Sequence, residues 1–368
     1  MQPILPVDRL RSIASKAATL LMTYPWKLWF WGDSIGLEGL LDAAELTGDE
    51  KYLGYVYGLL KGWIARESHR SEFDCTAAGA ALVRVFERTH DPALLDAAVR
   101  HSDYLCGFRR SDPGAYVRYE NAAFERPPEL PADHPESTPA NGSLNGAANL
   151  GPCVFVDSVH FDGPFFGRMY QVTGEDKYRQ LALDNILPQI ELLFDNEHNL
   201  FHHFWMERAR HCNGVFWGRG TGWGILGLVQ TLEYLGETGL ATARLVDVFR
   251  RVAARLGELQ DASGGWHTVL SDPTSYVETS IAAFAVDAFS RALSRHWIDE
   301  KPYGSIIEAA LRFLLSRMRA DGLLQGVSYE TFPSTRIEHY RGMPRNALVP
   351  WGQGPLLAAL WSYDQLCQ

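Results

Sequence analysis

Carboxylates stand just before several apolar segments of this chain, and Asp157 is the clearest case, since it precedes a segment that begins with Gly163-Pro164. Asp33 and Asp74 occupy comparable positions upstream. Two carboxylates that face each other closely take different pKa values, so that one can donate a proton while the other stays ionised. The pattern therefore allows general acid/base chemistry. A helix N-cap is the alternative explanation for each acid taken alone.

Tryptophans gather near the same segments, mostly in predicted loops rather than in helix centres. Flat aromatic rings suit the apolar faces of sugar rings, and ligand pockets collect aromatic side chains together with a few polar groups. The set therefore predicts a sugar-stacking cavity, with core packing as the alternative for any single member. Its members are Trp26, Trp29, Trp31, Trp205, Trp217, Trp223, Trp266 and Trp351.

Apolar residues recur with the period of an α-helix along nearly the whole chain, and the predicted helices come in pairs. The first member of each pair is rich in Gly, Ala and Leu, which suits burial on all sides, whereas the second is more charged and should lie outside. The predicted helices are 7–22, the pairs 34–47 with 50–66, 75–89 with 91–106, 162–173 with 176–194, 220–236 with 240–259 and 279–294 with 303–319, and a last helix at 354–366.

Two similar turns, Thr47-Gly48-Asp49 and Thr173-Gly174-Glu175, mark the repeat, with glycine as the helix C-cap. Twelve helices in six hairpins, with the first helix paired to the last, predict an all-α fold, an (α/α)6 barrel. We expect a single domain over 1–368, with short loops or β-hairpins over the mouth. An open solenoid is the alternative, but its repeats would be more uniform. A long loop at about 108–156 should lie on the active-site side.

Composition excludes several classes of partner. The chain has 368 residues, 46% of them apolar, and a net charge of -10. Nucleic acid and anionic membranes require a basic surface, so neither is expected as a partner. The five cysteines form no CxxC pair, which predicts free thiols in a reducing compartment. The first residues lack the pattern of a signal peptide, and no apolar window is long enough to cross a bilayer, so we expect a cytoplasmic protein.

The motifs together resemble a known family, the unsaturated rhamnogalacturonyl hydrolases of glycoside hydrolase family 105, which are relatives of the unsaturated glucuronyl hydrolases of family 88. The resemblance covers about residues 20–366. It rests on Asp157-x6-Pro164-Phe165, Leu200-Phe201-x-His203, Trp217-x-Arg219-Gly220-x-Gly222-Trp223, Gly265-Trp266-His267 and Tyr276-Val277-Glu278-Thr279-Ser280. It implies an (α/α)6 barrel that needs no metal or other cofactor. It also implies removal of the 4,5-unsaturated uronic acid that a polysaccharide lyase leaves at the non-reducing end of an oligosaccharide, such as one from rhamnogalacturonan.

The resemblance also implies roles for individual residues. Asp157 matches the family's catalytic acid/base, which would protonate C4 of the vinyl ether and activate the water that adds at C5. Asp74 matches a second aspartate, which would hold substrate hydroxyls and keep Asp157 protonated through like-charge repulsion. Arg118 would bind the uronate carboxylate in a bidentate manner. The remaining residues expected to bind the sugar are His203, Arg219, Trp223, Trp217, Trp31 and Glu278.

This chain departs from the family pattern after Asp157. Relatives commonly carry an apolar-rich segment between the aspartate and the proline, whereas this chain has His160-Phe161-Asp162. A second acid so close to Asp157 could alter its pKa or replace it. The insertion at about 121–150 has no match, so the sequence leaves open the leaving sugar and its subsites.

Three other interpretations compete with the hydrolase. A sugar epimerase with the same barrel would use His202 or His203 with His267 or His339 as acid and base on an N-acyl hexosamine. A non-catalytic carbohydrate-binding scaffold would use the tryptophans alone. A zinc site from His198, His202 and His203 is disfavoured because no further ligand group follows the pattern. We expect a small oligosaccharide as substrate and a monomer or homodimer in solution.

Overall fold

The computed structural model describes residues 3–27, 29–66, 79–118 and 151–368, and these contain twelve long helices. They are α1 (Val7–Leu21), α2 (Trp31–Thr47), α3 (Lys51–Ala65), α4 (Gly79–Thr89), α5 (Pro92–Cys106), α7 (Asp157–Thr173), α8 (Asp176–Leu193), α9 (Gly218–Leu235), α10 (Leu240–Leu259), α11 (Thr279–Ser294), α12 (Glu300–Ser316) and α14 (Pro350–Cys367). A short helix, α13 (Ile337–Arg341), lies between the last two. The predicted all-α class is confirmed.

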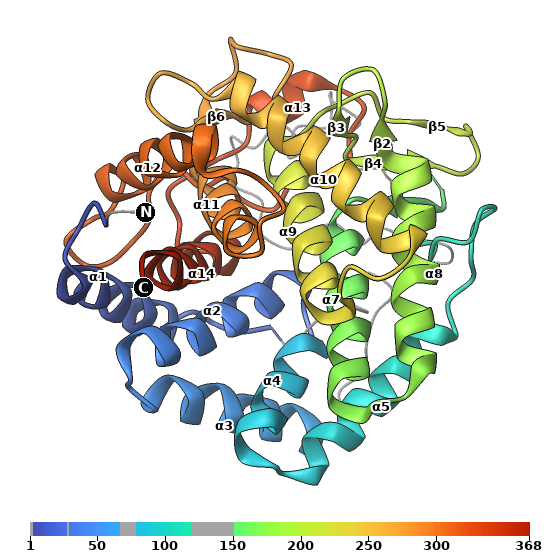
Figure 1. Cartoon of the computed structure of the whole chain (residues 1–368), viewed down its shortest axis with the longest axis horizontal. Helices are drawn as coiled ribbons and strands as arrows, with labels where there is room; N and C mark the ends of the chain where they lie inside the picture. The colour runs from blue at the N-terminus through green and yellow to red at the C-terminus, as the bar shows by residue number, and fades with distance from the viewer. Residues whose placement is uncertain (1–2, 28, 67–78, 119–150) are drawn as a thin grey trace.

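Six of these helices form a closed inner ring. Each of α2, α4, α7, α9 and α11 packs against the next, and α14 closes the ring against α2 (Figure 1). The other six, α1, α3, α5, α8, α10 and α12, lie outside. The first helix, α1, packs against both α2 and the last helix α14, so the expected pairing of the two ends of the chain is confirmed. This is the predicted (α/α)6 barrel, and that residues 1–368 form one domain stays a prediction.

Burial follows the composition of each helix. The inner helix α9 is buried almost all round and is rich in glycine and leucine, whereas the outer helix α10 buries only one face. Glycines let inner helices approach closely. A Cβ added to Gly39 in α2 would lie 2.5 Å from the backbone of Gly354 in α14. The small residues of the inner helices are therefore part of ring closure.

The two similar turns end their helices as expected. Gly48 and Gly174 are the C-caps of α2 and α7, with φ of 71° and 69°. Thr47 and Thr173 each donate a hydroxyl hydrogen bond to the carbonyl four residues earlier. The repeat therefore reflects the same local hydrogen bonding at both turns.

The start of α7 was predicted wrongly. The helix begins at Asp157 rather than at residue 162, so Asp157 lies in its first turn and Pro164 lies inside it. In the same way, α14 begins at Pro350 rather than at 354. Gly and Pro made these turns resemble loops, but burial against neighbouring inner helices overrides weak helix propensity. Residues 75–78, the predicted start of α4, lie outside the described residues.

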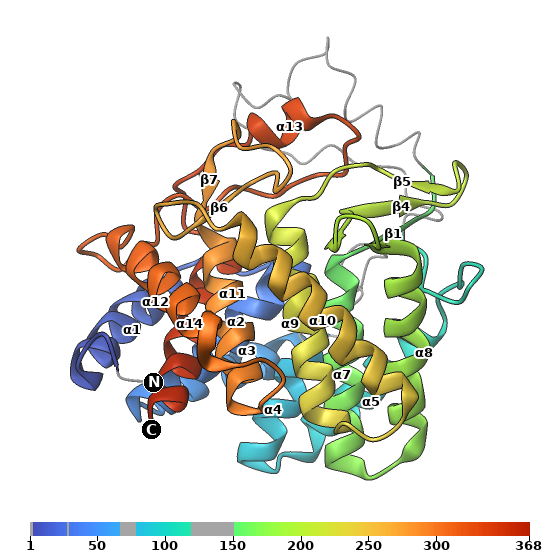
Figure 2. The same ribbon diagram turned by 45° about the horizontal axis from the view of Figure 1, so that its top comes forward.

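Short strands and α13 gather at one end of the barrel (Figure 2). One antiparallel sheet contains β1 (Cys153–Phe155), β4 (Phe204–Met206) and β5 (His211–Cys212). The others pair β2 (Phe194–Asp195) with β3 (Leu200–Phe201), and β6 (Trp266–His267) with β7 (Val277–Glu278). The β6–β7 hairpin confirms that a short β-hairpin lies over the mouth. Between α12 and α14 the structure has α13 and isolated bridges, one of which joins Ser328 to Arg345.

Of the predicted long loop, residues 108–118 and 151–156 are described, and Arg118 pairs with Cys153 across its base. The described cysteines, Cys106, Cys153, Cys212 and Cys367, are free thiols. In the described part of the chain, no helix is both long and apolar enough to cross a lipid bilayer.

Replacing Gly39 by alanine should destabilise the barrel, because the added methyl group would overlap the backbone of Gly354. Overpacking of this kind typically costs about 1–3 kcal/mol in the free energy of unfolding. Gly54 is the matched control, since it lies exposed in the outer helix α3 with nothing within 4 Å of an added Cβ. Gly54→Ala should stabilise the protein by about 0.5–1 kcal/mol. Urea denaturation measures both, and equal effects would show that the close approach is unimportant.

Candidate active site

The predicted site residues gather where the inner helices begin, below the short strands. Trp31 and Asp157 are the first residues of α2 and α7, Arg219 is in the first turn of α9, and Glu278 is the N-cap of α11. Asp74 lies outside the described residues, so its position beside Asp157 stays a prediction. The barrel therefore brings together residues that are more than 200 positions apart in the sequence.

Backbone pairing sets Asp157 against His203. Strand β1 runs directly into α7, and its pairing with β4 places Phe155 opposite Phe204. The next hydrogen bond runs from the Val156 N–H to the His203 carbonyl, at 3.0 Å. As a result, His203 Nε2 lies 3.9 Å from Asp157 Oδ2.

Asp157 is held in a partly desolvated position, with 18% of its side chain exposed. Burial raises the pKa of the Asp157 carboxyl to about 7, against smaller opposing effects from its own backbone N–H and from the charge of Arg219. Its Oδ2 atom has no hydrogen-bond partner among the described residues. A carboxyl group that is still protonated near neutral pH can act as a general acid.

His203 faces this carboxyl as a neutral ring. Burial, assisted by the charges of His339 and Arg219, lowers the pKa of His203 well below its ordinary value. The ring packs 4.4 Å from the Trp217 ring, and its Nδ1 lies 2.7 Å from the Tyr340 hydroxyl. His203 therefore contributes a hydrogen-bonding group without a charge.

Arg219 and Glu278 form a buried ion pair, with Nη1 and Oε1 separated by 3.4 Å and neither side chain exposed. The guanidinium also donates to the Ser328 carbonyl and hydroxyl at 3.0 and 2.8 Å, to the Tyr329 carbonyl at 2.7 Å and to the Thr331 hydroxyl at 2.9 Å. These bonds anchor residues 328–331 to α9. Arg219 is thus bonded to protein groups, and its expected contact with the sugar stays a prediction.

Glu278 joins the same segment to α11. It accepts hydrogen bonds from the Ser328 N–H at 2.9 Å, from the Ser280 hydroxyl at 2.6 Å and from the Ile281 N–H at 3.2 Å. The last of these is the N-cap bond of α11. In this conformation Glu278 positions Arg219 and the mouth, and its expected contact with substrate stays a prediction.

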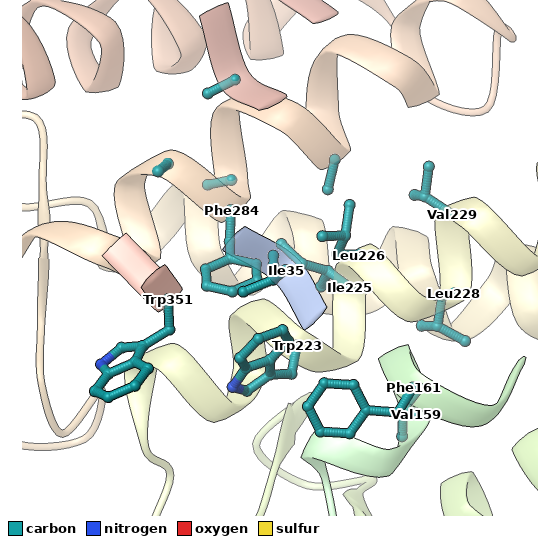
Figure 3. Close-up of a cluster of buried hydrophobic side chains, with 14 of the residues drawn as sticks. Ile35, Val159, Phe161, Trp223, Ile225, Leu226, Leu228, Val229, Phe284 and Trp351 are labelled. Atoms are coloured by element: carbon teal, nitrogen blue, oxygen red, sulfur yellow. The ribbon is translucent and has the colours of Figure 1, made fainter. Parts of the chain in front are cut away.

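Trp223 lies deeper, in the apolar cluster below the mouth. Its ring packs 5.1 Å from the ring of Phe161 and 4.7 Å from that of Phe284 (Figure 3). The indole Nε1 is a buried donor without an acceptor among the described residues. Trp31 is half-buried at the mouth, with its ring 4.8 Å from that of Trp351.

The predicted cavity lined by all eight tryptophans is wrong. Trp29 packs against Trp63, and the Trp266 indole donates to the Leu256 carbonyl of the outer helix α10. Large aromatic side chains remove so much apolar surface from water that core packing takes most of them. Six of the eight are buried, namely Trp29, Trp205, Trp217, Trp223, Trp266 and Trp351, whereas Trp26 and Trp31 keep part of their surface exposed.

Asp162 is separated from Asp157 by its partners. Arg118 Nη2 lies 3.2 Å from Asp162 Oδ1, and Gln189 of the outer helix α8 donates to Oδ2 at 3.0 Å. Burial raises the pKa of Asp162, while Arg118 and Gln189 oppose that shift. Asp162 therefore faces the outer layer in a buried ion pair. The guanidinium of Arg118, expected at the uronate carboxylate, is bonded to this protein carboxylate.

The histidines do not form the cluster that the zinc alternative requires, whereas His339 lies near enough to His203 for its charge to act on that ring. His198 and His202 each contact Asp195, at 3.1 and 3.2 Å, whereas His203 turns towards Tyr340. His267 contacts the Ser275 carbonyl. In the ranges that the structure describes, no three metal-binding side chains come together.

Sequence reasoning missed the residues that support the site. Tyr340 of the short helix α13 bonds to His203, Asn213 bonds to Tyr340, and Ser328 bonds to Arg219, and each partner lies more than 100 positions away in the sequence. No local periodicity or motif marks such contacts.

Replacing Glu278 by alanine should cost about 3–5 kcal/mol in unfolding free energy, because it leaves the Arg219 charge buried without its partner. The matched control is Glu258→Ala, which breaks an exposed pair with Arg255. Surface pairs contribute about 0–1 kcal/mol, so that variant should unfold almost as the unmodified protein does. Urea denaturation decides, and a small cost for Glu278→Ala would contradict the role of the buried pair.

Comparison with known proteins identifies a family, since residues 10–367 of the chain match Glycosyl Hydrolase Family 88. The unsaturated rhamnogalacturonyl hydrolase YesR of Bacillus subtilis (strain 168) is 25% identical over 342 residues, covering 90% of this chain and 88% of that protein. A possible member of the GH105 family from Salmonella enterica has a similar fold, with a TM-score of 0.82, 22% identity, and 99% of this chain and 96% of that chain covered.

The unsaturated glucuronyl hydrolase from Bacillus sp. GL1 is also similar in fold, with a TM-score of 0.70, 19% identity and 96% of each chain covered. The two structural similarities concern the fold, whereas the family match spans almost the whole sequence. The chain therefore belongs to Glycosyl Hydrolase Family 88 and is a glycosidase.

Proposed function

We propose that this glycosidase removes a 4,5-unsaturated uronic acid from the non-reducing end of lyase-generated oligosaccharides by hydrating the vinyl ether double bond. The observation that carries the proposal is the position of the Asp157 carboxyl, 3.9 Å from the buried His203 ring, where burial raises the carboxyl pKa to about 7. The names of relatives, which include unsaturated rhamnogalacturonyl and unsaturated glucuronyl hydrolases, support the same substrate class.

The chemistry suits a single acid/base group. The Asp157 carboxyl gives its proton to C4 of the vinyl ether, which leaves positive charge at C5 that the ring oxygen stabilises. Water adds at C5 and returns a proton to the Asp157 carboxylate. The resulting hemiketal opens, and the bond to the leaving sugar breaks as C1 becomes an aldehyde. Asp157 ends the cycle protonated, as it began.

Other residues have supporting roles in this proposal. Asp74 would hold substrate hydroxyls as the second aspartate. His203 and Trp217, which pack together beside Asp157, would contact the unsaturated ring. Trp223 offers a buried indole N–H that lacks an acceptor among the described residues. Trp31, half-buried at the mouth, has surface available for a following sugar.

Arg219, Glu278 and Arg118 act differently in the proposal, since each is already bonded to protein. The Arg219 charge would attract the uronate carboxylate without giving up its bonds to Ser328 and Tyr329. Glu278 would serve the substrate by holding Arg219. Arg118 would act from beside its pair with Asp162, which involves its Nη2 atom.

We further propose a cytoplasmic location, which the four free thiols among the described residues support. Val7 and Leu240 are the large apolar side chains exposed in the described residues, which supports a monomer or a homodimer rather than a larger assembly.

Asp157→Asn should slow consumption of the double bond by roughly a hundredfold to ten-thousandfold, because the amide cannot donate a proton to C4. Unsaturated galacturonyl-rhamnose and unsaturated glucuronyl disaccharides are suitable substrates. Loss of the ultraviolet absorbance of the conjugated double bond gives the rate. Asp321→Asn, at an exposed surface pair with Arg319, is the matched control and should keep full activity.

Three outcomes would contradict the proposal. Full activity of Asp157→Asn would move the acid role to another residue. Cleavage of a saturated uronide of the same structure would indicate ordinary displacement at the anomeric carbon. Unchanged absorbance together with epimerisation of an N-acyl hexosamine would favour the epimerase.

The rate should fall above about pH 7, since the Asp157 carboxyl must be protonated to act and burial raises its pKa to about 7. The kcat/KM of the free enzyme should stay level below this value and decrease about tenfold for each further pH unit above it. The pH profile of kcat/KM on an unsaturated disaccharide measures this decrease, which is the alkaline limb of the profile. A rate that instead increases through this range would show that the ionised form of the group is the active one.

A further inference from the structure

A buried network of hydrogen-bonding groups contacts Nδ1 of His203, on the side of the ring away from Asp157. His203 Nδ1 lies 2.7 Å from the Tyr340 hydroxyl, which in turn donates to the Ser334 carbonyl at 3.0 Å. The Asn213 amide donates to both, at 3.1 Å to the Tyr340 hydroxyl and at 3.0 Å to the Ser334 carbonyl. Because all four residues are buried, every polar atom of this network must have a hydrogen-bond partner in the network or in a neighbouring group.

The orientation of Asn213 follows from its neighbours. Its Oδ1 lies 3.4 Å from the Val215 N and 3.5 Å from the Phe204 N, and both of these groups can only donate. Its Nδ2 faces the Ser334 carbonyl, which can only accept. The two hydrogens of the amide are therefore assigned to Ser334 and Tyr340, with one bond to each.

Counting hydrogens then fixes the state of the imidazole. The Tyr340 hydroxyl lies at hydrogen-bond distance, 3.0 Å, from the Ser334 carbonyl, which carries no hydrogen of its own. With the hydroxyl hydrogen directed to Ser334, this hydroxyl has none left for His203. The contact of 2.7 Å to His203 is a hydrogen bond only if His203 Nδ1 is the donor. In a neutral ring, Nε2 then carries a lone pair.

We propose that Tyr340 is a positioning residue for the reaction, which holds His203 as the Nδ1–H tautomer so that Nε2 faces Asp157 and the substrate as a hydrogen-bond acceptor. This inference rests on the proposed function of Asp157 as the acid, but the tautomer itself can be measured without any turnover. An acceptor at Nε2 favours the protonated carboxyl, because only that form has a hydrogen to share. A donor at Nε2 would favour the carboxylate instead.

The groups around His203 and Asp157 also favour a neutral His203 ring. Among the residues that the structure describes, Asp157 of α7, Arg219 of α9, and His339 and Tyr340 of α13 are the titratable or charged groups that face His203. The charges of Arg219 and His339 disfavour a second proton on the ring, and burial does so more strongly. His203 therefore stays neutral, and its tautomer decides what it offers to Asp157.

Nitrogen NMR on protein labelled with 15N-histidine tests the tautomer directly. The signals of His203 are assigned as those missing from His203→Gln. We expect a protonated Nδ1 and a bare Nε2 in the unmodified protein. In Tyr340→Phe, Nδ1 loses its acceptor, so the balance should move towards Nε2–H. A protonated Nε2 in the unmodified protein would overturn the proposal whether or not the protein turns over substrate.

The pH profile tests the consequence for the acid. If Nε2 becomes a donor in Tyr340→Phe, the alkaline limb of kcat/KM should move to lower pH by roughly half a unit to one unit. The matched control is Tyr52→Phe, which removes a buried hydroxyl bonded to the Ser15 carbonyl between α3 and α1. That variant should keep the limb in place while losing similar stability.

These results distinguish failure of the positioning role of Tyr340 from failure of the proposed function. An unmoved limb in a folded Tyr340→Phe overturns the positioning role, even if the unmodified enzyme consumes the double bond as proposed. Equal displacement of the limb in both tyrosine variants would also overturn it, because the cause would then be general loosening. Failure of the unmodified enzyme to consume the double bond would refute the proposed function and leave the NMR result standing.

Discussion

The mouth of this barrel depends on the buried ion pair between Arg219 and Glu278. Burying two charges is costly, and it is tolerated only where the pair is close and the remaining hydrogen-bonding groups are matched. Here the guanidinium binds three residues of the 328–331 segment, and the carboxylate binds the same segment and caps α11. One ion pair therefore joins the inner helices α9 and α11 to residues 328–331, which lie outside the helices and strands.

The same pair helps to explain how Asp157 can be an acid near neutral pH. An unpaired arginine next to a buried carboxyl would favour the carboxylate and lower its pKa. Arg219 is paired with Glu278 at 3.4 Å, and burial outweighs the Arg219 charge, so the pKa of Asp157 rises to about 7. The mouth can thus hold both the positive charge of Arg219, which suits an anionic substrate, and the protonated carboxyl of Asp157.

The sequence predicted what depends on regular periodicity and on local motifs. The order of the helices and their inner and outer placement follow from apolar period and turns, whereas the grouping of Asp157, His203 and Arg219 was implied by the family resemblance. The start of α7, the burial of most tryptophans and the bonds of Tyr340 do not, since each depends on contacts between distant segments. Asp162 is an instructive case, because its role depends on Arg118 and Gln189, which no spacing connects to it.

Arg118 connects the helix that carries Asp157 to the start of strand β1. Its backbone pairs with Cys153 in both directions, at 2.8 and 3.0 Å, while its side chain binds Asp162 on α7. The chain is therefore fixed where it departs at 118 and where it returns at 153, and both points are tied to the helix that carries Asp157. The position of the acid is set by these described contacts and by the β1–β4 pairing, whatever the length of the chain between them.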